Sequence, residues 1–300
     1  MSLTPLDRNA ARHSFERAAA SYDQHAVLQC EVASRLLERV AYHRLEPGVI
    51  LDLGCGTGSG SRSLSSQFTH AQVIALDWSA AMLAQVGKGN ASAQASAKGP
   101  VRLCADMHAL PLAARSFDLV FSSLALQWSY DFPGLFSELR RVMRPGAMLI
   151  FTCYGPDTLF ELKQAWQSVD EHQHVNAHPD MHDIGDELLA AGFQEPVMDV
   201  EHLILEYPDV VSLMRELKSI GEQNVASERV RGLTGKKRFR GMLDAYEKFG
   251  RNDKYPASYE VIYGTAFAPV EGQPLRTQGG EVVTFSVDAL RSKSAVHKKK

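Results

Sequence analysis

The stretch that decides the fold reads Val49-Ile50-Leu51-Asp52-Leu53-Gly54-Cys55-Gly56-Thr57-Gly58. It is an apolar run of strand length that leads directly into a turn with three alternating glycines, and such a run predicts a buried strand. Because they lack a Cβ atom, Gly54, Gly56 and Gly58 can adopt positive φ and let a ligand approach the backbone closely. The stretch therefore predicts the first strand–turn–helix unit of a Rossmann-like α/β sheet.

The glycine spacing separates two classes of nucleotide-binding turn. If Gly54 and Gly56 opened the G-x-G-x-x-G fingerprint of dinucleotide-binding proteins, the last position would be Ser59 instead of glycine. The spacing Asp-x-Gly-x-Gly-x-Gly, which starts at Asp52, instead resembles motif I of the class I methyltransferases that use S-adenosylmethionine (SAM). A glycine-rich turn by itself is equally compatible with a structural role. An NAD-dependent oxidoreductase is the least favoured function class.

Two acidic residues follow the next two predicted strands. Asp77 ends the apolar stretch 72–77, and Asp106 ends the stretch 101–106. The carboxyl ends of parallel strands face the crevice in which open α/β sheets bind ligands. Asp77 also follows Gly54 at close to the offset of about 20 residues at which an acid binds ribose hydroxyls. A lone aspartate at a strand end is more often solvated or a helix N-cap, but the three features in this order favour a nucleotide site.

The composition restricts the class of protein. The chain has 300 residues, 45% of them hydrophobic, which is enough for one large core and an appendage. A net charge of −3 gives no general attraction to nucleic acid. The four cysteines form no C-x-x-C pair, so we expect reduced thiols and no metal. Without a leader pattern or a long apolar stretch, we expect a cytoplasmic protein that does not bind membranes.

The remaining pattern predicts a seven-stranded, mostly parallel sheet with helices on both faces. Strands are expected at 49–53, 72–77, 101–106, 117–123, 147–154, 197–206 and 259–267. Helices are expected within 7–40 and at 135–143, 157–171, 182–191, 210–220 and 236–249. The helical pair between the last two strands predicts a lid above the sheet.

This pattern divides the chain into five parts. We expect an N-terminal helical cap at 1–45, a SAM-binding Rossmann-like core at 46–207, a helical lid at 208–254, the last core strand at 255–270, and a C-terminal extension at 271–300. The Gly/Ala/Ser-rich stretch 87–99 has the composition of a flexible loop. The extension lacks periodicity from Arg291 onward, so we expect it to be disordered in part.

Segments throughout the chain resemble one enzyme family in particular. They are Ser14-Phe15, Ala18-Ala19, Tyr22-Asp23, Leu124–Trp128, Ala165–Glu171, His174, Asn176, Met214–Gly221, Leu233-Thr234, Tyr255-Pro256 and Tyr259. Together they resemble the malonyl-acyl-carrier-protein O-methyltransferase (BioC) family of class I SAM-dependent methyltransferases. This resemblance implies methylation of the free carboxylate of a malonyl thioester on acyl carrier protein. The resulting ester is elongated as a primer for biotin synthesis.

The resemblance also implies the residues of a SAM site. Asp77 would hold the ribose, Trp78 and Met82 would pack on adenine, and Asp106 and Met107 would meet the adenine edge. The complete expected set is Asp52, Gly54, Cys55, Gly56, Gly58, Asp77, Trp78, Met82, Asp106, Met107 and Leu124.

The candidate catalytic residues are Tyr22, Gln127, Trp128, His174 and Arg215. Tyr22 would close over the cofactor, and Gln127 and Trp128 follow the fourth strand beside the transferring methyl. His174 and Arg215 would reach the acceptor carboxylate. Each of these residues also has a plainer interpretation as core, packing or surface residue. A carboxylate is already ionised at pH 7, so its methylation requires no general base.

A local basic cluster predicts the partner surface. It comprises Arg229, Arg231, Lys236, Lys237, Arg238 and Arg240. An acidic acyl carrier protein would be steered to such a face. A solvated helix face and a nucleic-acid site are alternatives, and the absence of interleaved aromatic residues counts against the second.

Two other function classes stay open. A small-molecule methyltransferase, such as one acting on a quinone ring, would share the pattern up to Tyr154 but would not require a basic lid. A non-methylating homologue that acts on a protein would keep the SAM pocket without consuming SAM.

Overall fold

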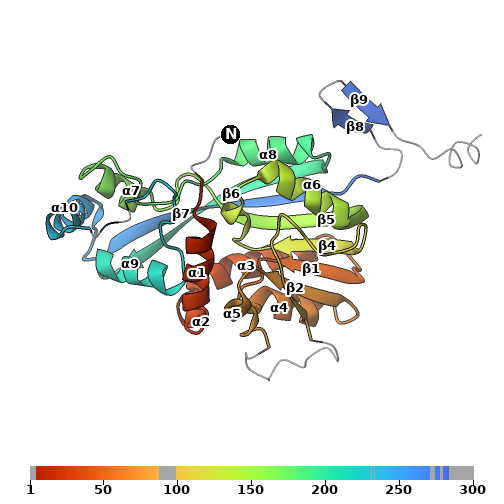
Figure 1. Cartoon of the computed structure of the whole chain (residues 1–300), viewed down its shortest axis with the longest axis horizontal. Helices are drawn as coiled ribbons and strands as arrows, with labels where there is room; N and C mark the ends of the chain where they lie inside the picture. The colour runs from red at the N-terminus through yellow and green to blue at the C-terminus, as the bar shows by residue number, and fades with distance from the viewer. Residues whose placement is uncertain are drawn as a thin grey trace, which may run out of the picture.

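One mixed sheet organises the molecule (Figure 1). The computed structural model describes residues 5–87, 99–230, 232, 234–270, 274–277 and 280–283. The strand order is β3-β2-β1-β4-β5-β7-β6, and the strands are β1 (Val49–Leu53), β2 (Gln72–Asp77), β3 (Val101–Cys104), β4 (Phe117–Ser122), β5 (Met143–Tyr154), β6 (Gln194–Tyr207) and β7 (Tyr255–Phe267). The first five strands pair in parallel, and β7 runs antiparallel to both β5 and β6. This arrangement confirms the predicted fold class.

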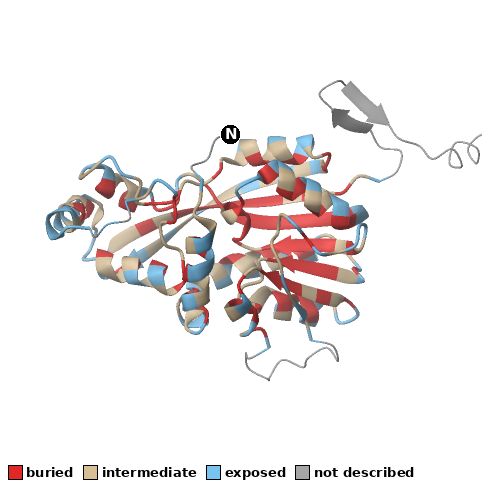
Figure 2. Ribbon diagram, viewed as in Figure 1, coloured by how far each residue is buried: buried red, intermediate tan, exposed pale blue. Residues whose placement is uncertain are grey.

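The central strands are buried, as Figure 2 shows in red. Ile50 and Leu51 are adjacent in β1 and fully buried, yet they belong to separate apolar clusters on opposite sides of the sheet. Helices therefore cover both faces, which explains why the strands read as continuous apolar runs. The helices of the core are α4 (Ser59–Gln67), α5 (Ala80–Leu83), η1 (Leu126–Trp128), α6 (Phe132–Val142), α7 (Phe160–Gln167) and α8 (Met181–Ala190).

The N-terminal helical region is divided into three helices, α1 (Arg8–Ala18), α2 (Tyr22–His25) and α3 (Val27–Ala41). Asp7 caps α1 by accepting a hydrogen bond from the Ala10 amide at 3.0 Å. Helix α3 packs its Val32 and Leu36 side chains into the core of the sheet. Helix α1 instead contacts α5 and α9 (Val210–Ser219). The first helices thus lie between the core and the segment that follows β6.

The segment between β6 and β7 is helical, as predicted. It contains α9, α10 (Lys236–Tyr246) and η2 (Glu247–Phe249). Two backbone hydrogen bonds join it to the N-terminus, from Asp7 N to Val225 O at 2.7 Å and from Ser227 N to Pro5 O at 2.8 Å. The predicted cap and the predicted lid are therefore joined by direct hydrogen bonds.

Several element boundaries differ from the sequence prediction. Strand β3 ends at Cys104, so Asp106 lies two residues beyond the strand. Strand β7 begins at Tyr255 instead of 259, because its pairing with β6 continues to the Tyr207–Tyr255 pair. Helix α7 is shorter than the expected 157–171, since Leu159 at its start has a φ of 56°.

The predicted loop at 87–99 and the predicted C-terminal extension are described only in part. A two-stranded sheet of β8 (Pro274–Thr277) and β9 (Gly280–Val283), which the sequence pattern did not predict, lies in the C-terminal extension. Residues 88–98 of the expected loop and the tail from Arg291 lie outside the described residues. No helix in the described part of the chain combines the length and apolarity needed to cross a bilayer.

A substitution at Gly264 would test how tightly the antiparallel strand β7 packs against β5. Gly264 pairs with Phe151 across β5 and β7, and a Cβ atom at this position would overlap the Phe151 ring. We expect Gly264→Ala to lower the free energy of unfolding by roughly 1–3 kcal/mol, because overpacking forces neighbouring groups apart. Urea unfolding measures this change. Gly99→Ala is the control, since a Cβ there meets nothing within 4 Å, and equal effects of the two variants would contradict the prediction.

Candidate active site

The glycine turn after β1 has the predicted backbone. Gly54, Gly56 and Gly58 have φ values of 73°, 54° and 83°. A Cβ atom on Gly54 would overlap the Ala125 side chain, whereas one on Gly56 would meet nothing within 4 Å. Packing therefore requires glycine at the first position, and Gly56 leaves its backbone open to a ligand.

Asp77 connects this turn to the end of β2. Its carboxylate accepts hydrogen bonds from the amides of Gly56 at 3.0 Å and Ser79 at 2.8 Å. Burial raises the pKa of Asp77 to about 6, although these amide hydrogen bonds act in the opposite direction. The carboxylate thus fixes the turn while lining a cavity beside it.

Asp106, which follows the neighbouring strand β3, also lines this cavity. Its carboxylate accepts a hydrogen bond from Arg8 of α1, and two others come from the backbone and ring nitrogens of His108, each at 3.0 Å. Partial burial alone would raise its pKa, but the hydrogen bonds from His108 and Arg8 hold the pKa below the ordinary value. The Arg8 guanidinium also lies 4.4 Å from the Tyr130 ring centroid. Helix α1 is thereby attached to the core beside the cavity.

We call this space the first cavity; its volume is about 690 Å³, including the part that is open to solvent. Ten of the residues predicted from the sequence line it, eight of them expected at the SAM site and two expected in catalysis. They are Gly54, Gly56, Asp77, Trp78, Met82, Asp106, Met107 and Leu124, together with Tyr22 and Trp128. Burial, followed by the nearby charge of Glu222, raises the pKa of Tyr22 well above its usual range. Its phenol is therefore neutral.

Three predicted SAM-site residues, Asp52, Cys55 and Gly58, are not on the wall of the first cavity. Asp52 is buried and accepts a hydrogen bond from the Ser61 hydroxyl of α4. The Cys55 amide donates to Leu76 O at 2.9 Å, and Gly58 is the N-cap of α4. Their contacts anchor the turn to β2 and α4.

A larger second cavity, of about 1520 Å³, lies between α7, α9 and the segment that follows them. Trp128 lines both cavities, so the two spaces meet at its indole. The wall of the second cavity carries His174, and also Tyr154, His178 and Glu222, which the sequence did not single out. Lys218 and Arg238 line it as well and are exposed to solvent, so they mark its opening.

The other three catalytic candidates, Gln127, His174 and Arg215, lie in different parts of the structure. The Gln127 side chain is buried and donates to Leu124 O at 2.7 Å, beside a third cavity. His174 stacks on Trp166 with centroids 3.8 Å apart and shares a 2.8 Å hydrogen bond with Asp170. Arg215 is exposed on α9 and does not line the first or second cavity of the described structure. The roles of all three stay predictions.

Comparison with known proteins agrees with this geometry. The family described as "Methyltransferase domain" matches residues 51–151. The YcgJ protein of Bacillus subtilis shares the fold, with a TM-score of 0.55 and 14% identity, over 78% of this chain and 97% of that one. Sheet order, glycine turn and family match together define a class I SAM-dependent methyltransferase.

Sequence relatives narrow the class to one family. The malonyl-[acyl-carrier protein] O-methyltransferase of Gallionella capsiferriformans is 49% identical over 267 residues, which cover 88% of this chain and 92% of the relative. The enzyme of the same name from Methylovorus sp. is 46% identical, over 88% of this chain and 90% of the relative. The chain therefore belongs to the malonyl-[acyl-carrier protein] O-methyltransferase family, which confirms the resemblance seen in the sequence.

The buried Asp52 predicts a dependence of stability on pH. Burial raises its pKa to about 7, with the Ser61 hydrogen bond opposing the shift. The folded state binds the carboxyl proton of Asp52 more tightly than the unfolded state does. The free energy of unfolding therefore falls as pH rises from about 4 to 7, because folding then requires either this proton or a buried charge. We expect Asp52→Asn to lose less stability than the wild type between pH 5 and 7.5, by on the order of 1–3 kcal/mol.

Urea unfolding at the two pH values measures this difference. Asp199→Asn is the control, because Asp199 is an exposed carboxylate that pairs with Arg39 at 2.7 Å. Equal losses in the wild type and Asp52→Asn would show that Asp52 does not hold a proton in the folded state.

Proposed function

We propose that this chain transfers the methyl group of SAM to the free carboxylate of a malonyl thioester carried by acyl carrier protein. The observation that carries the proposal is the second cavity, which opens among cations and ends at Trp128, on the wall of the first cavity. Such a space suits a long, flexible acceptor that enters from a carrier protein. The two relatives described above are named for this reaction.

The residues of the first cavity fit SAM. The open backbone at Gly56 leaves room for a close approach, and Asp77 presents a carboxylate suited to ribose hydroxyls. Met82 and Trp78 offer apolar surface for an adenine ring, with Asp106 beside them. When bound, SAM supplies an electrophilic methyl group on a positively charged sulfur.

The protein's own task is to orient the acceptor and exclude water. A malonyl carboxylate is ionised at neutral pH, so no side chain has to remove a proton. Good alignment of two reactants can lower a barrier by roughly 7–11 kcal/mol. Trp128 is held edge-on by Phe15 at a centroid distance of 5.1 Å, and the neutral Tyr22 closes the same side. These three rings line the first cavity and would help to keep water from the bound reactants.

The lid supplies a basic surface for the carrier protein. Lys236, Lys237 and Arg240 are exposed on α10, and Arg238 lies on the wall of the second cavity. Arg229 lines the same cavity and pairs with Asp7 at 3.2 Å. Arg231, the remaining member of the predicted cluster, lies outside the described residues. An acidic carrier protein would approach this face by electrostatic steering. The methyl ester formed there would serve as the primer for the biotin precursor.

Mass spectrometry of purified protein with SAM tests the reaction. We expect a gain of one methyl group on malonyl-acyl carrier protein and none on the acetyl-acyl carrier protein, which lacks a free carboxylate. Asp77→Ala removes the carboxylate that fixes the turn, so we expect SAM affinity to fall at least tenfold, about 1.4 kcal/mol. Isothermal titration calorimetry measures that loss, with Asp199→Asn as the surface control.

An absence of methyl transfer to every malonyl thioester, despite SAM binding, would contradict the proposal. It would direct the search to quinone-type small molecules or protein substrates.

Charge reversal on α10 tests the docking surface. We expect Lys236→Glu/Lys237→Glu to raise KM for malonyl-acyl carrier protein at least tenfold at low salt, with little change for malonyl-pantetheine, because only the carrier is steered by surface charge. Steady-state kinetics at two salt concentrations measure the effect. Arg44→Glu/Arg115→Glu is the matched control, since both side chains are exposed before the amino ends of β1 and β4. Equal effects of the two double variants would exclude α10 as the docking surface.

A further inference from the structure

A half-buried acid, Glu222, lies on the wall of the second cavity and has no role in the reaction described so far. It follows α9 and accepts hydrogen bonds from the Tyr154 hydroxyl at 3.2 Å and from Gln29 Nε2 at 3.4 Å. Gln29 also donates to the Tyr154 hydroxyl at 3.3 Å. Both hydrogen bonds to Glu222 end on Oε1, so its Oε2 is the oxygen left to meet a molecule in the cavity.

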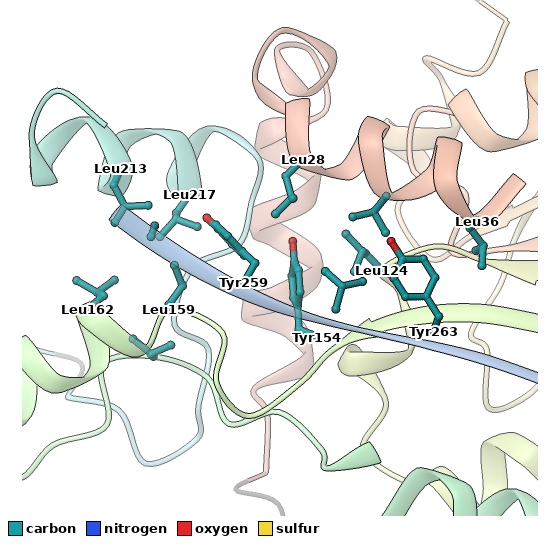
Figure 3. Close-up of a cluster of buried hydrophobic side chains, with 14 of the residues drawn as sticks. Leu28, Leu36, Leu124, Tyr154, Leu159, Leu162, Leu213, Leu217, Tyr259 and Tyr263 are labelled. Atoms are coloured by element: carbon teal, nitrogen blue, oxygen red, sulfur yellow. The ribbon is translucent and has the colours of Figure 1, made fainter. Parts of the chain in front are cut away.

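Glu222 is close to the meeting point of the two cavities. Its charge acts on Tyr22, which lines the first cavity, and Tyr154 lines the second. Figure 3 shows Tyr154 and Tyr259 projecting on the same side of the sheet, with Leu28 above Tyr154. An acceptor that reaches Trp128 through the second cavity therefore passes along the wall that carries Glu222.

The groups around Glu222 are neutral on most sides. Burial raises the pKa values of Tyr22 (α2), Tyr154 (β5), Tyr207 (β6) and Tyr259 (β7) above the usual tyrosine range. Burial also lowers the pKa of His178 to about 3, so its ring is uncharged, and its buried Nδ1 has no hydrogen-bond partner in the described structure.

The acid itself titrates near neutrality. Burial raises the pKa of Glu222 to about 7, and the negative charge of Glu216 on α9 acts in the same direction, against the hydrogen bonds from Gln29 and Tyr154. The cations that line the second cavity are not among the hydrogen-bond partners of Glu222.

We propose that Glu222, in its protonated form, is a specificity-determining residue that donates a hydrogen bond from Oε2 to the carboxylate of the acceptor. This inference rests on the proposed function. Methyl transfer removes the acceptor's negative charge, so a salt bridge would stabilise the starting state more than the transition state. A neutral donor orients the carboxylate without that penalty. Glu222 keeps its proton throughout, and once ionised it repels the acceptor.

The pH dependence of kcat/KM for malonyl-pantetheine tests this role. For the wild type we expect a fall of about tenfold per pH unit above roughly pH 7, as Glu222 loses its proton. The Glu222→Gln variant retains a hydrogen-bond donor but cannot ionise. Its kcat/KM should therefore stay constant between pH 7 and 9. A Glu222 that acted as a general base would give the opposite slope in the wild type.

Glu216→Gln is the matched control from the same helix. Glu216 accepts a hydrogen bond from Tyr207 at 2.8 Å and does not line the second cavity. Because the charge of Glu216 raises the pKa of Glu222, this variant should keep the alkaline fall and begin it at lower pH. Binding of SAM to each variant, measured by calorimetry, shows that the fold is intact.

A second measurement requires no variant. Malonyl-pantetheine binding to the wild type with S-adenosylhomocysteine, measured at pH 7.5 in buffers of different ionisation enthalpy, should show net proton uptake, because a bound anion favours protonated Glu222. No uptake, or a Glu222→Gln profile that matches the wild type, would overturn the role of Glu222 and leave the proposed function standing. Failure of the wild type to methylate any malonyl thioester would overturn the proposed function instead.

Discussion

The candidate site depends on the hydrogen bonds that Asp77 accepts from Gly56 and Ser79, at 3.0 and 2.8 Å. One carboxylate at the end of β2 thereby fixes both the glycine turn after β1 and the start of α5, whose Met82 lines the first cavity. Burial makes this arrangement costly, as the raised pKa of Asp77 shows. The amide hydrogen bonds offset that cost, and a ligand with hydroxyl groups would offset it further.

The N-terminal segment contributes to the wall of the first cavity. Arg8 pairs with Asp106 beside this cavity, and Asp7 bonds both to the backbone of Val225 and to Arg229 in the predicted lid. Cap, core and lid are thus joined through two consecutive residues. The same N-terminal segment contacts Trp128, which lines both cavities, through the edge of the Phe15 ring at a centroid distance of 5.1 Å.

Charge is distributed unevenly along the second cavity. Exposed Lys218 and Arg238 lie at the opening, whereas Tyr154, a neutral His178 and Glu222 line another part of the wall and are less exposed. Cations in water attract an acidic partner at little desolvation cost. A buried cation near the reacting carboxylate would instead stabilise the charge that methyl transfer removes. This separation of charges suits two tasks. Surface cations attract the acidic carrier protein, and neutral side chains inside the cavity can form hydrogen bonds to the acceptor carboxylate.

The sequence by itself determined the sheet, the glycine turn and most of the first-cavity residues, because strand periodicity, missing Cβ atoms and acids at strand ends are local signals. It did not distinguish residues that line the cavity, such as Gly56, from those that anchor the glycine turn, such as Asp52. Only the tertiary structure decided that Arg8 meets Asp106, 98 positions away, or that Gln29, Tyr154 and Glu222 form one cluster. The reason is physical: these side chains come from elements far apart in the chain, and only packing on the common sheet brings them into contact.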